Sequence, residues 1–170
     1  ALAKQIAGIR RKRYRVAVAP TMLTLSEVAR AVSLPVFAQH VDPVESGSYT
    51  GAITVPELQQ AKVTGVILNH SERKLSLGTL KKTLELCKRK LMTVVCASTI
   101  GEIKKIAALH PDYIAYEPKT LIGGELSVTK AKPEIILKAV ETVKQISPVT
   151  KVLCGAGVHS KEDIGQSLLL

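Results

Sequence analysis

The feature that most constrains the fold is a repeated unit made of a short apolar run, a few polar residues and a segment with helical periodicity. Six such runs of mainly β-branched or aliphatic residues occur along the chain, at residues 15–19, 36–39, 65–68, 92–96, 113–116 and 151–154. They are almost continuously apolar, as expected for parallel strands covered on both faces. Six of these units in a row predict an α/β protein, either doubly wound or a (β/α)₈ barrel.

Helices are predicted between the runs from apolar residues that recur at helical spacing. One set comprises Leu77, Leu80, Leu84 and Leu91, a second Ile103, Ile106 and Leu109, and a third Ile135, Ile136, Ala139, Val140, Val143 and Ile146. Capping boxes are predicted at Thr54–Glu57, Thr99–Glu102 and Ser160–Asp163. Because no linker or low-complexity stretch interrupts this pattern, residues 1–170 are predicted to form a single domain.

The position of the polar residues favours the barrel over the doubly wound sheet. A doubly wound nucleotide-binding protein would carry Gly-x-Gly-x-x-Gly after an early strand, and the sequence has no such motif. Barrel enzymes instead place their reactive side chains just after the carboxyl ends of several strands. Here those positions hold His40, residues 69–73, Ser98, Glu117 and the turn at 155–157.

Composition excludes several classes of protein. No apolar run reaches the roughly 18 residues needed to span a bilayer, so no membrane association is expected. The charge of +10 would attract phosphate, but aromatic residues make up only 3%, so we expect a small anionic substrate and no nucleic acid. Three cysteines without a Cys-x-x-Cys pair argue against a zinc site or a disulfide framework, and they fit a reducing cytoplasm.

His70 and Glu117 are the strongest candidates for chemistry. His70 follows an apolar strand directly and lies among polar residues, although a strand-end histidine that only caps a helix or binds a carbonyl fits equally well. Glu117 is the one acid of the apolar segment 113–117 and stands at its last position, where shielding from water makes a carboxylate a more effective base. The alternative for Glu117 is an ion pair with a basic residue.

Three loops are weaker candidates. Residues 118–124 have apolar residues at the tip and glycines at the far end, which suits either a lid or an ordinary turn. The turn at 155–157 can present backbone amides to a phosphate or merely connect a strand to a helix. Residues 46–51 form a long polar loop typical of an interface or a lid.

His40 with Asp42 suggests a metal, but no third ligand is suitably spaced, so no metal is expected.

Five motifs, in order, give the sequence a specific resemblance. They are Phe37-Ala-Gln-His40, Gly47-Ser-Tyr-Thr-Gly51, Leu68-Asn-His-Ser-Glu-Arg73, Tyr116-Glu-Pro118 with Leu121-Ile-Gly123, and Cys154-Gly-Ala-Gly157. Together they resemble the triosephosphate isomerase family in its compact archaeal form. The resemblance implies a (β/α)₈ TIM barrel with about six of its eight units in this chain, from late in the first helix to early in the seventh. It also implies interconversion of glyceraldehyde 3-phosphate and dihydroxyacetone phosphate, in glycolysis and gluconeogenesis, without a cofactor.

The resemblance also implies the catalytic roles, which are those known for the family. His70 matches the neutral imidazole that polarises the substrate carbonyl, and Glu117 matches the base that moves a proton between adjacent carbons. Ile122 and Gly157 match positions whose backbone amides contact the substrate phosphate.

Supporting positions follow from the same motifs. Asn69, Ser71 and Glu72 match the usual neighbours of the histidine, and Gly123 lies in the lid motif. Thr50 matches a residue that reaches a neighbouring subunit's site, so a homo-oligomer, either a dimer or a tetramer, is implied.

The ends of the sequence leave other interpretations open. No initiator Met is present, so we expect the chain to begin inside a longer gene product. By the resemblance, the family's first strand would precede residue 1 and its eighth strand would follow residue 170. The lid has Gly123-Gly124-Glu125 where archaeal relatives commonly have Gly-Thr-Gly. One alternative is an inactive truncated fragment or a basic polyanion-binding module. Another is a different phosphosugar-handling (β/α)₈ enzyme, which does not explain residues 69–72 together with 117–118.

Overall fold

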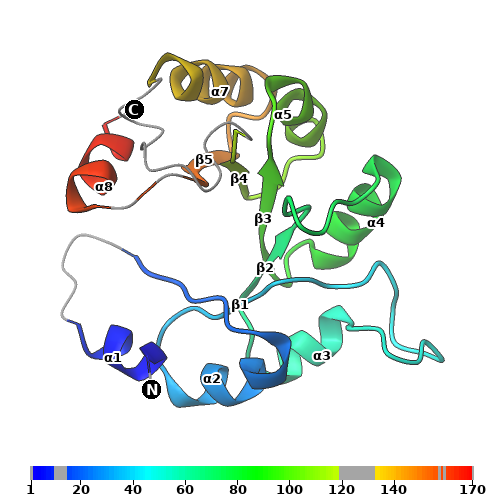
Figure 1. Ribbon diagram of the computed structural model, residues 1–170. Helices are drawn as coiled ribbons and strands as arrows, with labels where there is room; N and C mark the ends of the chain where they lie inside the picture. Colours follow the sequence, from blue (N-terminus) through cyan, green and yellow to red (C-terminus); the bar gives the residue numbers. More distant parts are fainter. Residues whose placement is uncertain (1, 10–14, 119–132, 157, 159, 170) are drawn as a thin grey trace. The chain divides into compact units, whose positions relative to one another are not determined.

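A computed structural model describes residues 2–9, 15–118, 133–156, 158 and 160–169 (Figure 1). The chain forms two compact units. The first comprises Ala1–Leu68 with Gly78–Thr93, and the second comprises Asn69–Leu77 with Val94–Leu170. The division falls just after one strand and inside the next, so the segment that carries His70 belongs to the second unit.

The first unit contains short helices and two parallel strands. Its elements are α1 (Leu2–Gly8), the 3₁₀ helix η1 (Met22–Thr24), α2 (Leu25–Ala31), β1 (Phe37–Ala38), α3 (Val55–Gln60), β2 (Gly65–Leu68) and nearly all of α4 (Leu77–Cys87). Phe37 of β1 lies opposite Gly65 of β2. A Cβ atom at position 65 would lie 2.7 Å from the Phe37 ring and 2.8 Å from the Met92 carbonyl, so any side chain there would force its neighbours to move.

The second unit is a parallel sheet covered by helices. Its elements are β3 (Met92–Ala97, whose first two residues belong to the first unit), α5 (Ile100–Ala107), β4 (Tyr113–Tyr116), α7 (Pro133–Ile146), β5 (Lys151–Cys154) and α8 (Lys161–Ser167). In the sheet β4 pairs with both β3 and β5. Helix α5 packs on β4, α7 packs on β5, and the two helices contact each other (Figure 1). Fully buried Ile103, Ile114 and Val143 contribute to this aliphatic core.

The predicted parallel α/β class is confirmed, and most predicted strands occur where expected. The bounds at 65–68, 113–116 and 151–154 are the observed ones, and β3 is one residue longer than predicted. All described residues of β3 and β4 except the first of each are buried, as predicted for strands covered on both faces. The prediction fails for β5, whose residues alternate between exposed and half-buried.

The predicted strand at 15–19 is wrong. In its place Val18 forms a single parallel bridge with Val36, through bonds from the Val18 amide to the Pro35 carbonyl (3.0 Å) and from the Phe37 amide to the Val18 carbonyl (2.9 Å). The pairing cannot extend because Pro35 has no N–H to donate and Pro20 follows at once. Strand β1 is also shorter than the predicted 36–39.

Two of the three predicted capping boxes are confirmed. Thr54 with Glu57 and Ser160 with Asp163 make both reciprocal bonds at the starts of α3 and α8. At α5 the Thr99 hydroxyl accepts the Glu102 amide at 3.1 Å, but the Glu102 carboxylate binds Ser98 instead of the Thr99 amide. The third box is therefore only half formed.

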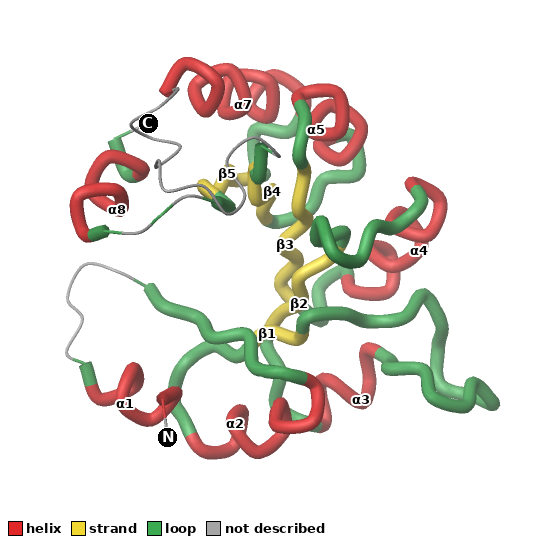
Figure 2. The backbone as a smooth tube through the Cα atoms, viewed as in Figure 1, coloured by secondary structure: helices red, strands yellow, loops and turns green. Residues whose placement is uncertain are grey.

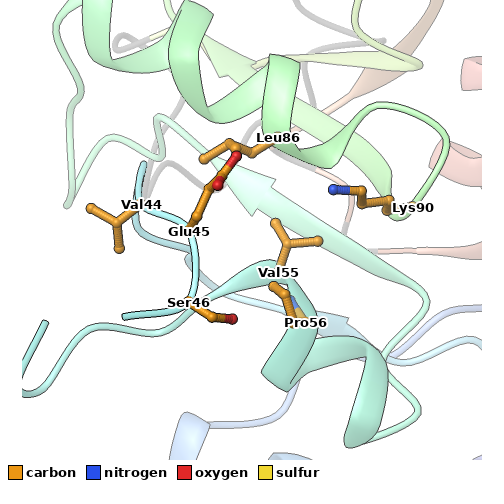
Figure 3. A pocket seen from close by; sticks show the side chains of 7 residues that line it. All are labelled: Val44, Glu45, Ser46, Val55, Pro56, Leu86 and Lys90. Atoms are coloured by element: carbon orange, nitrogen blue, oxygen red, sulfur yellow. The ribbon is translucent and has the colours of Figure 1, made fainter. Parts of the chain in front are cut away.

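The connection between β1 and α3 projects from the first unit as a long loop, drawn in green in Figure 2. A cavity of about 290 Å³ lies at its base, lined by residues 44–46, by Val55 and Pro56 of α3, and by Leu86 and Lys90 (Figure 3). Of the sequence-predicted site residues that the structure describes, none lines this cavity. Within the described residues, no helix is both long enough and apolar enough to cross a membrane.

Candidate active site

The candidate site lies in the second unit, where residues that directly follow strands come together. Asn69 and His70 follow β2, Ser98 follows β3, Glu117 follows β4 and Gly155 follows β5. All five positions are carboxyl ends of parallel strands, which is where (β/α)₈ enzymes carry their reactive groups.

Asn69 fixes the turn that carries His70. Its backbone is left-handed, with φ of 58°, a conformation that asparagine tolerates better than most residues. Its side-chain amide donates to the Cys96 carbonyl at 2.9 Å, and its side-chain oxygen accepts the Leu75 amide at 2.9 Å. Because Asn69 is buried, these two bonds are shielded from water and tie the turn to the end of β3.

The His70 ring lies between Glu72 and Glu117. Its Nδ1 is 3.4 Å from both the backbone nitrogen and a carboxylate oxygen of Glu72. These two contacts favour opposite protonation states of Nδ1. The carboxylate side chain is 88% exposed and screened by water, whereas the amide is fixed by the turn, so we assign Nδ1 as an acceptor. The proton of the neutral imidazole is then on Nε2, which points to Glu117.

The distance between His70 Nε2 and Glu117 Oε1 is 3.9 Å. This is too long for a hydrogen bond, so the two side chains are not hydrogen-bonded to each other. The His70 side chain is 41% exposed and that of Glu117 only 11%. The partly exposed Nε2 donor of His70 and the shielded carboxylate of Glu117 thus face each other.

Glu117 is held by neighbours on both adjoining strands. Its backbone amide donates to the Ala97 carbonyl at 2.7 Å, and the Cys96 thiol lies 3.5 Å from its Oε1 as a donor. On the other side, a Cβ atom at Gly155 would lie 2.5 Å from Glu117 Cγ. No ion pair with lysine or arginine is recorded for Glu117 among the described residues, so the alternative predicted for it gains no support there.

The Cys96 thiol has low reactivity as a nucleophile. Burial, the negative charge of Glu117 and the hydrogen bond to that carboxylate raise its pKa to about 12. The thiol therefore stays protonated at neutral pH and acts as a hydrogen-bond donor rather than a nucleophile.

The remaining sequence-predicted residues have mixed outcomes. Ile122, Gly123 and Gly157 lie outside the described residues, as does most of the predicted lid. Ser71 is half-buried next to His70. Thr50 is exposed on the projecting loop of the first unit.

The His40–Asp42 pair has a structural explanation. His40 Nε2 lies 3.0 Å from Asp42 Oδ1, and Asp42 Oδ2 accepts the Ile53 amide at 2.8 Å. The pair closes the base of the projecting loop. Within the described ranges no group of three or more His, Cys, Asp or Glu side chains is arranged to hold a metal ion.

Comparison with known proteins identifies the family. The triosephosphate isomerase family profile matches residues 1–167. The chain is 38% identical to the triosephosphate isomerase of Methanothermus fervidus, over 92% of this chain and 71% of that protein. It is 40% identical to the enzyme of Methanocaldococcus jannaschii (90% and 70% covered) and 41% identical to that of Methanosarcina acetivorans (90% and 69% covered). The chain belongs to the triosephosphate isomerase family. The resemblance inferred from its five motifs is thereby confirmed, together with the archaeal character of its relatives.

Sequence reasoning missed three features of this candidate site. These are the Cys96 thiol on Glu117, the close approach of Gly155 to Glu117, and the contact of Glu102 with Lys74. The contact of Cys96 with Glu117 could have been predicted, because Cys96 is the penultimate residue of β3 and Glu117 directly follows β4, the next strand along the chain. The other two depend on distances between segments that no local pattern encodes.

Proposed function

We propose that this protein is a triosephosphate isomerase that interconverts glyceraldehyde 3-phosphate and dihydroxyacetone phosphate by proton transfer through an enediolate. The observation that carries the proposal is the pair His70 and Glu117, which face one another across 3.9 Å in a member of this family. An aldose–ketose isomerisation needs a base beside the two carbons and a hydrogen-bond donor for the developing oxyanion. The pair supplies one of each.

Glu117 is the proposed base. Its carboxylate removes the proton from one carbon of the triose phosphate and returns it to the adjacent carbon. Because the two carbons are adjacent, a carboxylate held in one place can reach both of them, so it can remove the proton from one and deliver it to the other. The contacts with Cys96 and Gly155 support this role because they restrict the side chain.

His70 is the proposed electrophile. With Nδ1 accepting the Glu72 amide, the neutral ring presents its Nε2–H to the substrate oxygen on which charge develops. A neutral donor polarises this oxygen without having to lose a full charge when the proton shifts. Asn69 supports His70 by fixing the turn, and Ser71 and Glu72 complete the turn after it.

The phosphate grip, the lid and the assembly are part of the proposal. We assign the backbone amides of Ile122 and Gly157 to the substrate phosphate and Gly123 to the lid, which excludes water from an enediolate that would otherwise lose phosphate. We further propose one barrel domain over residues 1–170. We also propose a homo-oligomer, dimeric or tetrameric, in which Thr50 reaches the neighbouring subunit's site. The reaction needs no cofactor or metal, and we assign it to glycolysis and gluconeogenesis in the cytoplasm.

The test is a coupled assay of isomerisation in both directions on the full protein that carries this sequence. We expect activity that falls by about 10²- to 10⁴-fold in Glu117→Gln, which keeps the shape of the side chain and removes the base. We expect a loss of similar order in His70→Gln. Circular dichroism and thermal unfolding would verify that both variants are folded.

Glu85→Gln is the matched control, because Glu85 is an exposed carboxylate on α4 of the first unit. It should keep wild-type activity. An inactive wild-type protein would overturn the proposal in favour of the inactive-fragment alternative. A Glu117→Gln variant with wild-type kcat would overturn the assigned base.

A further inference from the structure

The turn that carries His70 is tied to the second unit at a point that the proposed chemistry does not use. Lys74 lies four residues after His70, and its Nζ is 3.3 Å and 3.2 Å from the two carboxylate oxygens of Glu102. Glu102 is in the first turn of α5, the helix that follows β3. This ion pair therefore joins segments that are 28 residues apart in sequence.

The Glu102 carboxylate does not bind the backbone amide of its own cap residue, Thr99, and contacts Ser98 and Lys74 instead. At α3 the equivalent acid, Glu57, binds the backbone amide of its own cap residue Thr54 at 2.8 Å. Glu102 instead accepts the Ser98 amide at 2.7 Å and the Ser98 hydroxyl at 3.0 Å on Oε2, while both of its oxygens contact Lys74. One carboxylate thus links the loop after β3 with the turn after β2.

That link completes a frame around the two proposed catalytic groups. Asn69 fastens the start of the His70 turn to the Cys96 carbonyl, and Lys74 fastens its far end through Glu102 to Ser98. The intervening Ala97 carbonyl accepts the Glu117 amide at 2.7 Å. Residues 96–98 therefore hold both ends of the His70 turn and the backbone of Glu117.

We propose that Lys74 and Glu102 are positioning residues that set the distance of the His70 ring from Glu117. This inference rests on the proposed function, since it concerns the same site. Both side chains are 36% exposed, so the ion pair contributes little to stability. Its effect on the rate can be larger, because a misplacement of about 1 Å can cost about 10²-fold.

The charge state of Glu102 agrees with this role. Burial alone would raise the pKa of Glu102, but the hydrogen bonds from the Ser98 amide, Lys74 and the Ser98 hydroxyl, with the charge of Lys74, outweigh it and lower the pKa below its usual value. Glu102 is therefore ionised at neutral pH and carries the negative charge that an ion pair with the Lys74 ammonium requires.

The test compares variants of the full protein. Lys74→Met keeps the length of the side chain and removes its charge, and we expect kcat to fall by roughly 10-fold with little change in KM. Lys74→Arg keeps the charge and can bind both oxygens of the Glu102 carboxylate, so its kcat should stay within about 2-fold of the wild type. The double variant Lys74→Met with Glu102→Gln should be about as impaired as the worse of the two single variants, because both act through one contact. Lys81→Met, an exposed lysine on α4, is the control and should leave kcat unchanged.

A second readout follows the His70 ring directly. We expect the ¹⁵N and ¹H NMR signals of this ring to shift in Lys74→Met and to return in Lys74→Arg. Wild-type kcat in Lys74→Met, or ring signals identical to the wild type, would overturn the positioning role. A Lys74→Arg variant as impaired as Lys74→Met would overturn it too, since the charge would not be what matters. If the wild-type protein has no isomerase activity, the proposed function fails, while the NMR comparison still decides whether Lys74 positions His70.

Discussion

Replacing Gly155 by alanine tests how strictly the backbone after β5 fixes the Glu117 carboxylate. The new Cβ atom would lie 2.5 Å from Glu117 Cγ, 3.1 Å from the Tyr116 carbonyl oxygen and 3.2 Å from Ala115 Cβ. Carbon atoms prefer separations of about 3.5–4.0 Å, so roughly 1 Å of movement is required. The Gly155 amide donates to the Tyr116 carbonyl at 2.9 Å, which holds the backbone in place. The Glu117 side chain must therefore give way.

A carboxylate displaced by about 1 Å should lower kcat by about 10²-fold. The assay is steady-state isomerisation with kcat and KM determined separately, after circular dichroism has established that the variant is folded. Two alanine variants serve as controls. Gly65→Ala meets the Phe37 ring at 2.7 Å, a comparable conflict that does not involve Glu117, and Gly101→Ala meets nothing nearer than the Thr99 hydroxyl at 3.8 Å.

We expect Gly65→Ala to lose stability while its folded fraction keeps most of its kcat, and Gly101→Ala to resemble the wild type. A folded Gly155→Ala protein with wild-type kcat would refute the reasoning, because it would mean that the carboxylate tolerates the displacement. A loss of kcat in Gly65→Ala equal to that in Gly155→Ala would refute it equally, since any steric conflict would then suffice.

Two further predictions concern stability. Thr54→Ala removes both side-chain contacts with Glu57 at the start of α3 and should lower the free energy of unfolding by about 1 kcal/mol in a urea titration, whereas Thr54→Ser should keep most of it; equal midpoints for all three proteins would contradict this. The second concerns Cys96, whose folded-state pKa is raised from 9.0 to about 12. Between these values the unfolded thiol loses its proton and the folded one keeps it, so stability falls as pH rises through this window. Cys96→Ala should therefore show a shallower decline in alkaline solution, and an unchanged slope would argue against the raised pKa.

The strands of the second unit were predictable because their physics is local. A parallel strand covered on both faces needs a short apolar run, and it ends where polar residues begin, so β4 could be bounded from sequence to the residue. The bounds of β5 were also predicted to the residue, although its residues are exposed or half-buried. The strand at 15–19 failed because its pairing depended on Pro35, a partner 17 residues away from Val18 that cannot donate a hydrogen bond.

The candidate site divides in the same way. His70 and Glu117 were predictable because reactive groups follow strands, and their motifs are specific to the family. What holds them could not be predicted. The half-formed cap at Thr99 illustrates the reason: the local pattern predicts that Glu102 binds the Thr99 amide, whereas the carboxylate binds Ser98 and a lysine 28 residues upstream.

Asn69 has a consequence for how this protein can vary. Lys62 and Arg89 also adopt left-handed backbones, with φ of 63° and 61°, but both are exposed and glycine would suit their backbone conformation better. At position 69 glycine would satisfy the backbone and lose both side-chain bonds, and aspartate would keep an acceptor for Leu75 and lose the donor to Cys96. Only asparagine meets all three requirements. A strict requirement for one amino acid therefore falls on Asn69, a residue to which the proposed chemistry assigns no step.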